Sequence, residues 1–194
     1  MSAETLAEVA LLVAVLVLLG FYVSWRAGRL DRLHTRVEAA QAALDAALIR
    51  RSAVTMELAA SGALDPAASL LLAEAAQAAR RAGDADHREL AESDLSRALR
   101  AVIGRPERGA AVAGADGGAE LLAELDAACN QVYLARRFYN DAVAVTRVAR
   151  SRRVVRALRL AGSAQLPGFF EIDDDPPERV PAARGEQDSR NGTE

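Results

Sequence analysis

Residues 6–25 have the sequence LAEVALLVAVLVLLGFYVSW, in which Glu8 is the one charged side chain. A helix needs about 20 apolar residues to cross the hydrocarbon core of a bilayer. Phe21, Tyr22 and Trp25 gather at one end of the stretch, where aromatic side chains anchor a spanning helix at the membrane surface. The stretch therefore predicts an N-terminal transmembrane helix.

A cleaved signal peptide is the alternative interpretation of the same stretch. A signal peptide begins with a basic region, whereas this chain carries Glu4 and Glu8 there. It also ends at a cleavage site made of small residues, which Ser24, Trp25 and Arg26 do not supply. The sequence thus favours a retained membrane anchor over a cleaved leader.

Basic residues follow the apolar stretch, and none precedes it. The first four are Arg26, Arg29, Arg32 and Arg36. Because basic flanks stay on the cytoplasmic side of a membrane, residues 1–5 are expected outside and the bulk of the chain in the cytoplasm. The sequence therefore predicts a single-pass protein of the cell membrane, with the lipid bilayer as its first partner.

The rest of the chain is rich in residues that favour helix. Hydrophobic residues make up 51% of the sequence, whereas aromatic residues make up only 4%. Alanine and leucine lose little freedom on entering a helix, while strands depend on aromatic and β-branched residues. We therefore predict an all-α fold in which residues 26–162 form an elongated antiparallel helical bundle. The formal net charge of −3 argues against nucleic acid as a partner.

Capping residues and glycines divide this bundle into helices. Apolar residues recur with coiled-coil spacing from Leu30 to Leu58. Because no proline occurs before Pro66, the transmembrane helix is expected to continue to about Ala60. Aspartate followed by proline at 65–66 opens a second helix. The further expected segments are a third helix opening near Asp86, a glycine-rich loop over 104–118, a fourth helix over about 119–160, and a largely disordered, acidic, proline-containing tail over 163–194.

The sequence predicts no catalytic residue, no cofactor and no metal site. Four potential metal ligands crowd together at Asp84, Asp86, His87 and Glu89. Acids at such a place are typical of a helix N-terminus, where they cap free amides and complement the dipole. Cys129 is the single cysteine, and its apolar helical setting predicts a buried small hydrophobe. We therefore expect a protein that is not an enzyme.

The end of the fourth expected helix is basic and amphipathic. Valine and leucine side chains fill one arc of residues 147–159, and arginines fill most of the other. This pattern fits packing on a bundle with a charged outer face, and it also fits contact with a membrane surface. In an up-down-up-down bundle this end returns to the membrane, where anionic lipids attract basic side chains. The candidate lipid-contacting residues are Arg26, Arg29, Arg32, Arg152, Arg153, Arg156 and Arg159.

Three short segments give the chain a family resemblance. Residues 135–143, ARRFYNDAV, resemble the signature of the LemA family, and residues 91–99, AESDLSRAL, resemble that family's third-helix segment. The tail motif LPGFF at 166–170 also agrees. The family often repeats a Tyr-Asn pair one heptad later, where this chain has Thr146 and Arg147.

The resemblance covers most of residues 6–172 and implies a LemA-like, membrane-anchored antiparallel bundle without enzymatic activity. Some members of the family are linked to membrane remodelling in bacterial organelles, and others are encoded near membrane proteases. The resemblance therefore implies a scaffold or adaptor at the cytoplasmic membrane that binds another membrane protein. The alternative function is a membrane-surface protein that acts on anionic lipid or membrane shape through its basic end.

The signature residues have their own physical interpretation. Those at helical spacing share a face, so a tyrosine and an asparagine there are expected to hydrogen-bond across to the first or third helix and fix the register. Partner binding is the alternative role. The positions concerned are Arg136, Arg137, Tyr139, Asn140 and Val143. The sequence does not identify the partner. It also leaves the oligomeric state open, and a homo-oligomer is one of the possibilities.

Overall fold

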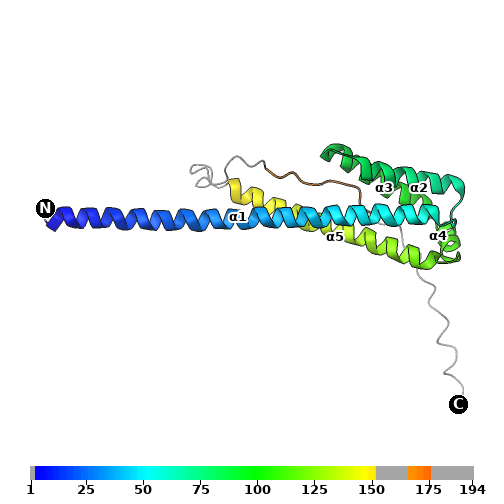
Figure 1. The fold of residues 1–194 in the computed structure, drawn as a ribbon, viewed down its shortest axis with the longest axis horizontal. Coiled ribbons are helices and arrows are strands. Elements are labelled where there is room, and N and C mark those ends of the chain that lie inside the picture. The colour runs from blue at the N-terminus through cyan, green and yellow to red at the C-terminus, as the bar shows by residue number, and fades with distance from the viewer. Residues whose placement is uncertain (1–2, 152–165, 176–194) are drawn as a thin grey trace, which may run out of the picture. The chain divides into compact units, whose positions relative to one another are not determined.

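The computed structural model describes residues 3–151 and 166–175, and every regular element in these two ranges is a helix. This confirms the predicted all-α fold class. The helices are α1 (Ala3–Ala60), α2 (Pro66–Arg81), α3 (Ala85–Ile103), α4 (Pro106–Ala113) and α5 (Gly118–Ser151) (Figure 1).

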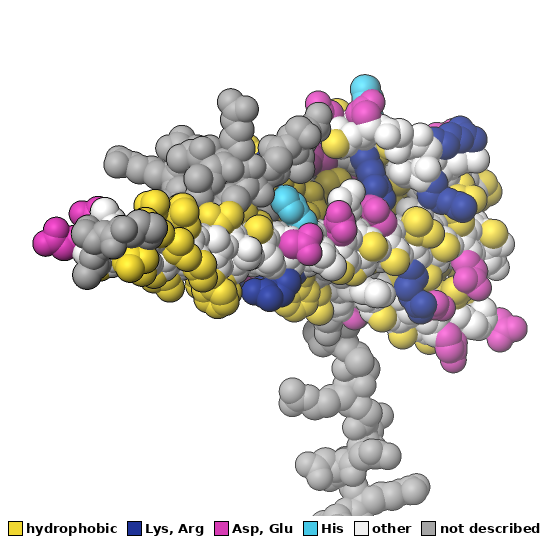
Figure 2. Space-filling view, turned by 60° about the vertical axis from the view of Figure 1, so that its left-hand side comes forward, with side chains coloured by type: hydrophobic (Ala, Val, Ile, Leu, Met, Phe, Trp, Pro, Cys, Tyr) yellow, Lys and Arg dark blue, Asp and Glu magenta, His cyan; other side chains and the backbone are white. Residues whose placement is uncertain are grey.

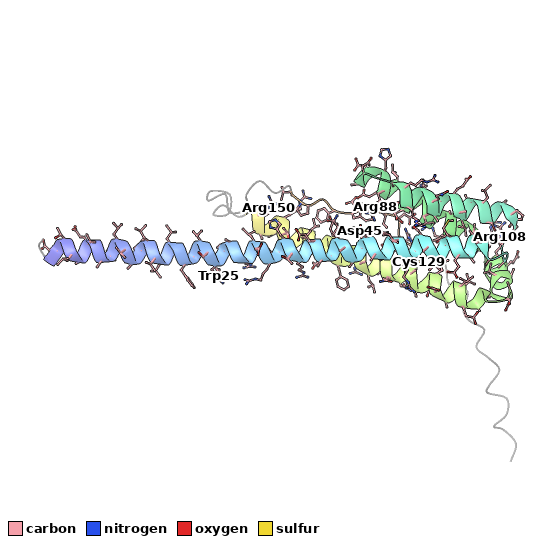
Figure 3. All side chains as sticks on the ribbon, viewed as in Figure 1. Trp25, Asp45, Arg88, Arg108, Cys129 and Arg150 are labelled. Atoms are coloured by element: carbon pink, nitrogen blue, oxygen red, sulfur yellow. The ribbon has the colours of Figure 1, made fainter. Side chains whose placement is uncertain are left out.

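Helix α1 is continuous over 58 residues, as the coiled-coil spacing and the absence of proline predict. At 1.5 Å per residue it is about 87 Å long. It is the one helix among the described residues that is long and apolar enough to cross a membrane. Figure 2 shows hydrophobic side chains gathered over its N-terminal part, and Trp25 projects outward from it (Figure 3). The apolar side chains of this part are exposed in the structure.

The chain divides into two compact units, and α1 and α5 contribute to both. Unit 1 contains the described residues up to Ala46 and those from Leu134 to Phe170. Unit 2 contains the residues between Ala47 and Tyr133 and the described residues from Glu171 onward. Each unit is described by itself below.

Unit 2 has a hydrophobic core to which all five helices contribute. Helices α2 and α3 lie side by side (Figure 1) and bury Leu72, Leu95 and Leu99 against Leu58 of α1. Leu125 of α5 joins the same cluster. Leu58 is the last residue of the apolar stripe that the sequence pattern identifies over residues 30–58, and its burial here confirms that part of the pattern.

Two aspartates begin the helices of unit 2. The Asp65 carboxylate accepts a hydrogen bond from the Ala68 backbone N–H at 2.9 Å, which confirms the predicted N-cap of α2. Helix α3 begins slightly before the predicted start near Asp86, because Asp84 has extended backbone and accepts from the His87 N–H at 2.9 Å. An aspartate in this conformation satisfies an otherwise free amide of the first turn.

The glycine-rich stretch 104–118 contains helix α4, so the prediction of a loop throughout it is wrong. Pro106 stands at the first helical position, where proline costs nothing, and alanines follow it. Val112 is buried in the core of unit 2 and holds the short helix in place. A turn then brings Gly118 so close to α4 that a Cβ there would lie 1.8 Å from the Val112 carbonyl oxygen. Only glycine fits at that position.

Cys129 lies in the core of unit 2, which confirms the sequence interpretation. Burial raises the pKa of its thiol, and the thiolate is the reactive form. We therefore expect no labelling by iodoacetamide while unit 2 is folded, and complete labelling in denaturant. The single cysteine makes labelling specific without any substitution. Labelling of the folded protein at the rate of a free thiol would contradict this placement.

Candidate functional site

Part of the 135–143 segment of α5 packs against α1 within unit 1. Val143 and Ala142 are buried against Val37 of α1, and Tyr139 lies partly buried at the edge of this cluster. Beside it, Arg36 and Asp141 form an exposed ion pair at 3.3 Å. Val143 therefore acts as a core residue that holds α5 against α1.

Asn140 and Tyr139 bind the backbone of the tail motif. The Asn140 amide Nδ2 donates to the Phe170 carbonyl oxygen at 3.0 Å, and its Oδ1 accepts from the Phe170 N–H at 2.9 Å. The Tyr139 hydroxyl donates to the Gly168 carbonyl oxygen at 2.9 Å. We call these three hydrogen bonds the tail clip. A single asparagine thus satisfies both backbone polar groups of Phe170.

The tail clip corrects the expected role of Asn140. The sequence interpretation had Asn140 bonded to the first or third helix, but both hydrogen bonds of its side chain go to Phe170. The physical reason is that Asn140 is half-buried and the Phe170 backbone lies within hydrogen-bonding distance of both its amide atoms. Phe170 is itself 9% exposed, and the Arg147 guanidinium lies 5.2 Å from the centre of the Phe169 ring.

The residues that follow the tail motif, from Glu171 on, form hydrogen bonds within unit 2. The Glu171 N–H donates to Glu89 Oε1 at 3.0 Å, and the Asp173 N–H donates to Ser93 Oγ at 3.1 Å. Arg100 forms a two-pronged ion pair with the Asp173 carboxylate. Composition predicts disorder over 163–194, but residues 166–175 have these defined partners. The other residues of the predicted tail lie outside the described ranges.

Acid is expected to release the bonded segment around Asp173. The hydrogen bond from Arg100 holds the pKa of Asp173 below its ordinary value of 3.8. A depressed pKa means that this contact stabilises the folded state above about pH 3.8 and that the stabilisation is lost as the pH falls through the lowered pKa. The backbone amide of Asp173 should therefore gain hydrogen-exchange rate below pH 3.8, beyond the intrinsic change.

The control for this prediction is Asp173→Asn, which removes the titrating group. Its exchange rate at position 173 should already be raised at neutral pH and should show no further acid-linked rise. An acid response that persists in Asp173→Asn would assign the effect to another carboxylate.

Unit 2 also contains a buried ion pair that the sequence pattern does not predict. The Arg51 guanidinium donates to Glu92 Oε2 at 2.7 Å and to Ser96 Oγ at 3.0 Å, and both charged side chains are 2% exposed. It also donates to the Glu92 carbonyl oxygen at 3.2 Å. Burial raises the pKa of Glu92, and the attraction of Arg51 opposes that rise.

One sequence feature could have predicted that Glu92 is buried, namely its position on α3 relative to the apolar residues. Glu92 and Ser96 are four residues apart on the face of α3 that carries Leu95 and Leu99, so the helical pattern buries them. Arg51 donates hydrogen bonds to both Glu92 and Ser96, so the three side chains form one buried cluster. We interpret the pair as part of the core of unit 2.

His87 and its acidic neighbours have the arrangement of a helix N-terminus. His87 Nδ1 lies 2.7 Å from Asp84 Oδ2, and both side chains are exposed. The hydrogen bonds with His87 lower the pKa of Asp84. Within 3–151 and 166–175, no group of three or more His, Cys, Asp or Glu side chains converges as metal ligands would.

A groove lies beside the residues of α1 that directly follow the apolar stretch 6–25. All the residues that line it belong to unit 1. The groove has a volume of about 270 Å³. The Arg26 Nε donates to the Tyr22 hydroxyl at 3.1 Å, and the guanidinium also lies 5.9 Å from the centre of the Trp25 ring. The groove is lined by Arg26, Arg29 and Leu30 of α1 and by Ala144, Val145, Val148 and Ala149 of α5. Of the other candidate lipid-contacting residues, Arg32 is exposed, and Arg152, Arg153, Arg156 and Arg159 lie outside the described residues.

The outer face of the signature is apolar as well as basic. Phe138 is 65% exposed and Leu134, one turn earlier, is 51% exposed. Phe138 also borders a shallow hollow of about 470 Å³. Its other lining residues are Arg136, Arg137, Asn140 and Asp141. We call Leu134 and Phe138 the apolar ridge.

No family model matches the sequence, and no curated protein matches it either.

Proposed function

We propose that this chain is a non-enzymatic scaffold or adaptor of the LemA type, anchored in the cell membrane by residues 6–25. Its N-terminus faces out, and residues 26–162 form an antiparallel bundle in the cytoplasm that binds another membrane protein. The length and apolar character of the first part of α1 support the anchor. The arginines directly after it support the orientation.

The apolar ridge is the observation that carries the adaptor role. Two large apolar side chains one helical turn apart stay exposed, although the opposite face of the same helix is buried. Aromatic side chains flanked by arginine are enriched at the centres of protein interfaces. Phe138 stands beside Arg137 and so presents this combination on the outer surface. The tail clip lies on the neighbouring face and leaves the ridge uncovered.

The chemistry of the ridge indicates the kind of partner it fits. Leu134 and Phe138 are spaced as successive positions of a helix–helix seam, so an apolar helix can pack on them. Asp141 and Arg137 border this surface with opposite charges. A partner helix with an apolar stripe and mixed charges at its edges would be complementary to both features.

Site-specific photo-crosslinking tests this function. A photoreactive amino acid at Phe138 should give one discrete adduct with another membrane protein in intact cells. The matched control is the same amino acid at Leu70, a leucine of α2 that is 60% exposed. Phe138→Asp should abolish capture of that partner without changing the amount of protein in the membrane. Adducts of the same kind at both positions, or none at 138, would contradict the adaptor role.

A second function has one observation in its favour. The groove lined by Arg26 and Arg29 follows directly on the apolar segment and combines basic side chains with an apolar lining. Such a surface suits a protein that acts on anionic lipid at the membrane face. The crosslinking outcome separates the two functions, because a lipid-directed protein needs no protein partner at Phe138.

A further inference from the structure

The groove at the end of the apolar segment has two kinds of lining. Its basic side is Arg26 and Arg29, and none of its seven lining residues is acidic. Its apolar side includes Val145 and Val148 of α5, which are 39% and 63% exposed. Leu30 is buried at 4% exposure and closes the bottom. A ligand that fits must carry a negative charge next to a hydrocarbon part.

The two arginines differ in the contacts that hold their guanidinium groups. Arg26 is held in place by Tyr22 and Trp25, and its bonded atom is Nε, so the two terminal amino groups point to no described partner. Arg29 makes no hydrogen bond or ion pair with any residue in 3–151 or 166–175. A guanidinium with a free fork binds a phosphate through two parallel hydrogen bonds. The groove thus offers positive charge that the described protein does not neutralise.

The position and the volume of the groove indicate which class of ligand it can bind. It follows residue 25, where aromatic side chains mark the end of the segment that we propose to span the membrane. Its volume of about 270 Å³ lies just below the range of pockets that enclose a whole small molecule. A phospholipid headgroup and the glycerol region can enter, while the acyl chains remain in the bilayer beside α1. A soluble phosphate compound would leave Val145 and Val148 uncovered.

We propose that this groove binds the headgroup region of one anionic phospholipid, with its phosphate on Arg26 and Arg29 and its glycerol region against Val145 and Val148. The proposal rests on the membrane anchoring in the proposed function and adds a defined lipid site to it. A bound lipid would tie α5 to the membrane end of α1 and fix how unit 1 stands on the bilayer surface.

Trp25 is the single tryptophan and gives a built-in reporter next to Arg26. The full chain is reconstituted in phosphatidylcholine vesicles that contain brominated phosphatidylglycerol or, at the same mole fraction, brominated phosphatidylcholine. Bromine quenches tryptophan fluorescence only at short range. We expect stronger quenching by the anionic lipid. Arg29→Gln should lower this preference about fivefold, the equivalent of about 1 kcal/mol for one close basic charge.

Two further variants separate a site from general attraction. Arg32→Gln removes the same charge from an exposed position that is outside the groove, and it should keep the preference. Val148→Asp places a negative charge in the groove at a position that is 63% exposed, so folding is preserved while the preference is lost. Equal losses in Arg29→Gln and Arg32→Gln would overturn the site in favour of diffuse charge attraction.

The remaining outcomes distinguish the site from the anchor. Equal quenching by the two brominated lipids would show Trp25 in the bilayer and would overturn the lipid site while the membrane anchor stands. Quenching by neither lipid would place Trp25 outside the bilayer, and the anchor in the proposed function would then fail together with the site.

Discussion

Replacement of Arg51 by methionine is expected to destabilise unit 2 by about 3–5 kcal/mol, because it leaves the Glu92 carboxylate buried without its partner. Glu92 and Arg51 are each 2% exposed, so water cannot replace the lost contact. Methionine keeps most of the side-chain length, which limits the effect of an empty cavity. The free energy of unfolding is measured on the full chain in detergent by the denaturant dependence of Cys129 labelling.

A second ion pair, which joins Arg50 of α1 to Glu124 of α5, provides the matched control. Arg50 and Glu124 lie 2.9 Å apart with 54% and 43% of their side chains exposed. Exposed pairs contribute about 0–1 kcal/mol, so Arg50→Met should change the stability little. The double variant Arg51→Met, Glu92→Met should be more stable than Arg51→Met alone, because no charge is left buried. Equal effects of Arg50→Met and Arg51→Met would contradict the structural importance of burial here.

The pH dependence of the Arg51→Met variant follows from the sign of the Glu92 shift. Burial already raises the pKa of Glu92 above its ordinary value of 4.5 in the presence of Arg51, and removal of Arg51 raises it further. A raised pKa means that folding favours the protonated form below about pH 4.5 and that this stabilisation is lost as the pH rises through the folded-state pKa. The variant should therefore regain part of its stability as the pH falls toward 4.5.

Periodicity and capping chemistry predict most of the helices in this chain. The continuity of α1 follows from unbroken apolar spacing, and Asp65 followed by Pro66 is a local signal for the start of α2. Cys129 is predicted to be buried for the same reason as its apolar neighbours. Each of these features depends on residues within a few turns of one another, so a single sequence contains all the information that is needed.

The features that the sequence did not predict join residues far apart in the chain. Arg51 and Glu92 are 41 positions apart, and no local pattern identifies which buried arginine meets which buried acid. Asn140 and Phe170 are 30 positions apart. The bonds use the backbone N–H and C=O of Phe170, which every residue except proline has, so the sequence cannot identify Phe170 as the partner. The resemblance to the LemA signature did single out Asn140, but it gave no indication of the atoms that Asn140 binds.

The tail clip gives the second large effect, in the variant Asn140→Asp. Aspartate still accepts a hydrogen bond from the Phe170 N–H but has no donor for the Phe170 carbonyl oxygen, which then faces a negative charge. A buried polar group without its partner costs about 1–3 kcal/mol. We expect the Phe170 amide to exchange about ten times faster or more in hydrogen-exchange measurements, since a factor of ten corresponds to about 1.4 kcal/mol.

The control is Gln131→Glu, which makes the same amide-to-carboxylate change at an exposed position of α5 and should leave Phe170 unchanged. The Asp173 amide should respond less than the Phe170 amide in Asn140→Asp, because Ser93 and Arg100 hold that residue within unit 2. If Phe170 exchanges at the wild-type rate in Asn140→Asp, its buried ring and the Tyr139 hydroxyl are sufficient to hold the motif. The Asn140 hydrogen bonds would then not contribute to the protection of Phe170. If Phe170 and Asp173 both lose protection together, residues 166–175 behave as one cooperative segment that depends on a single asparagine.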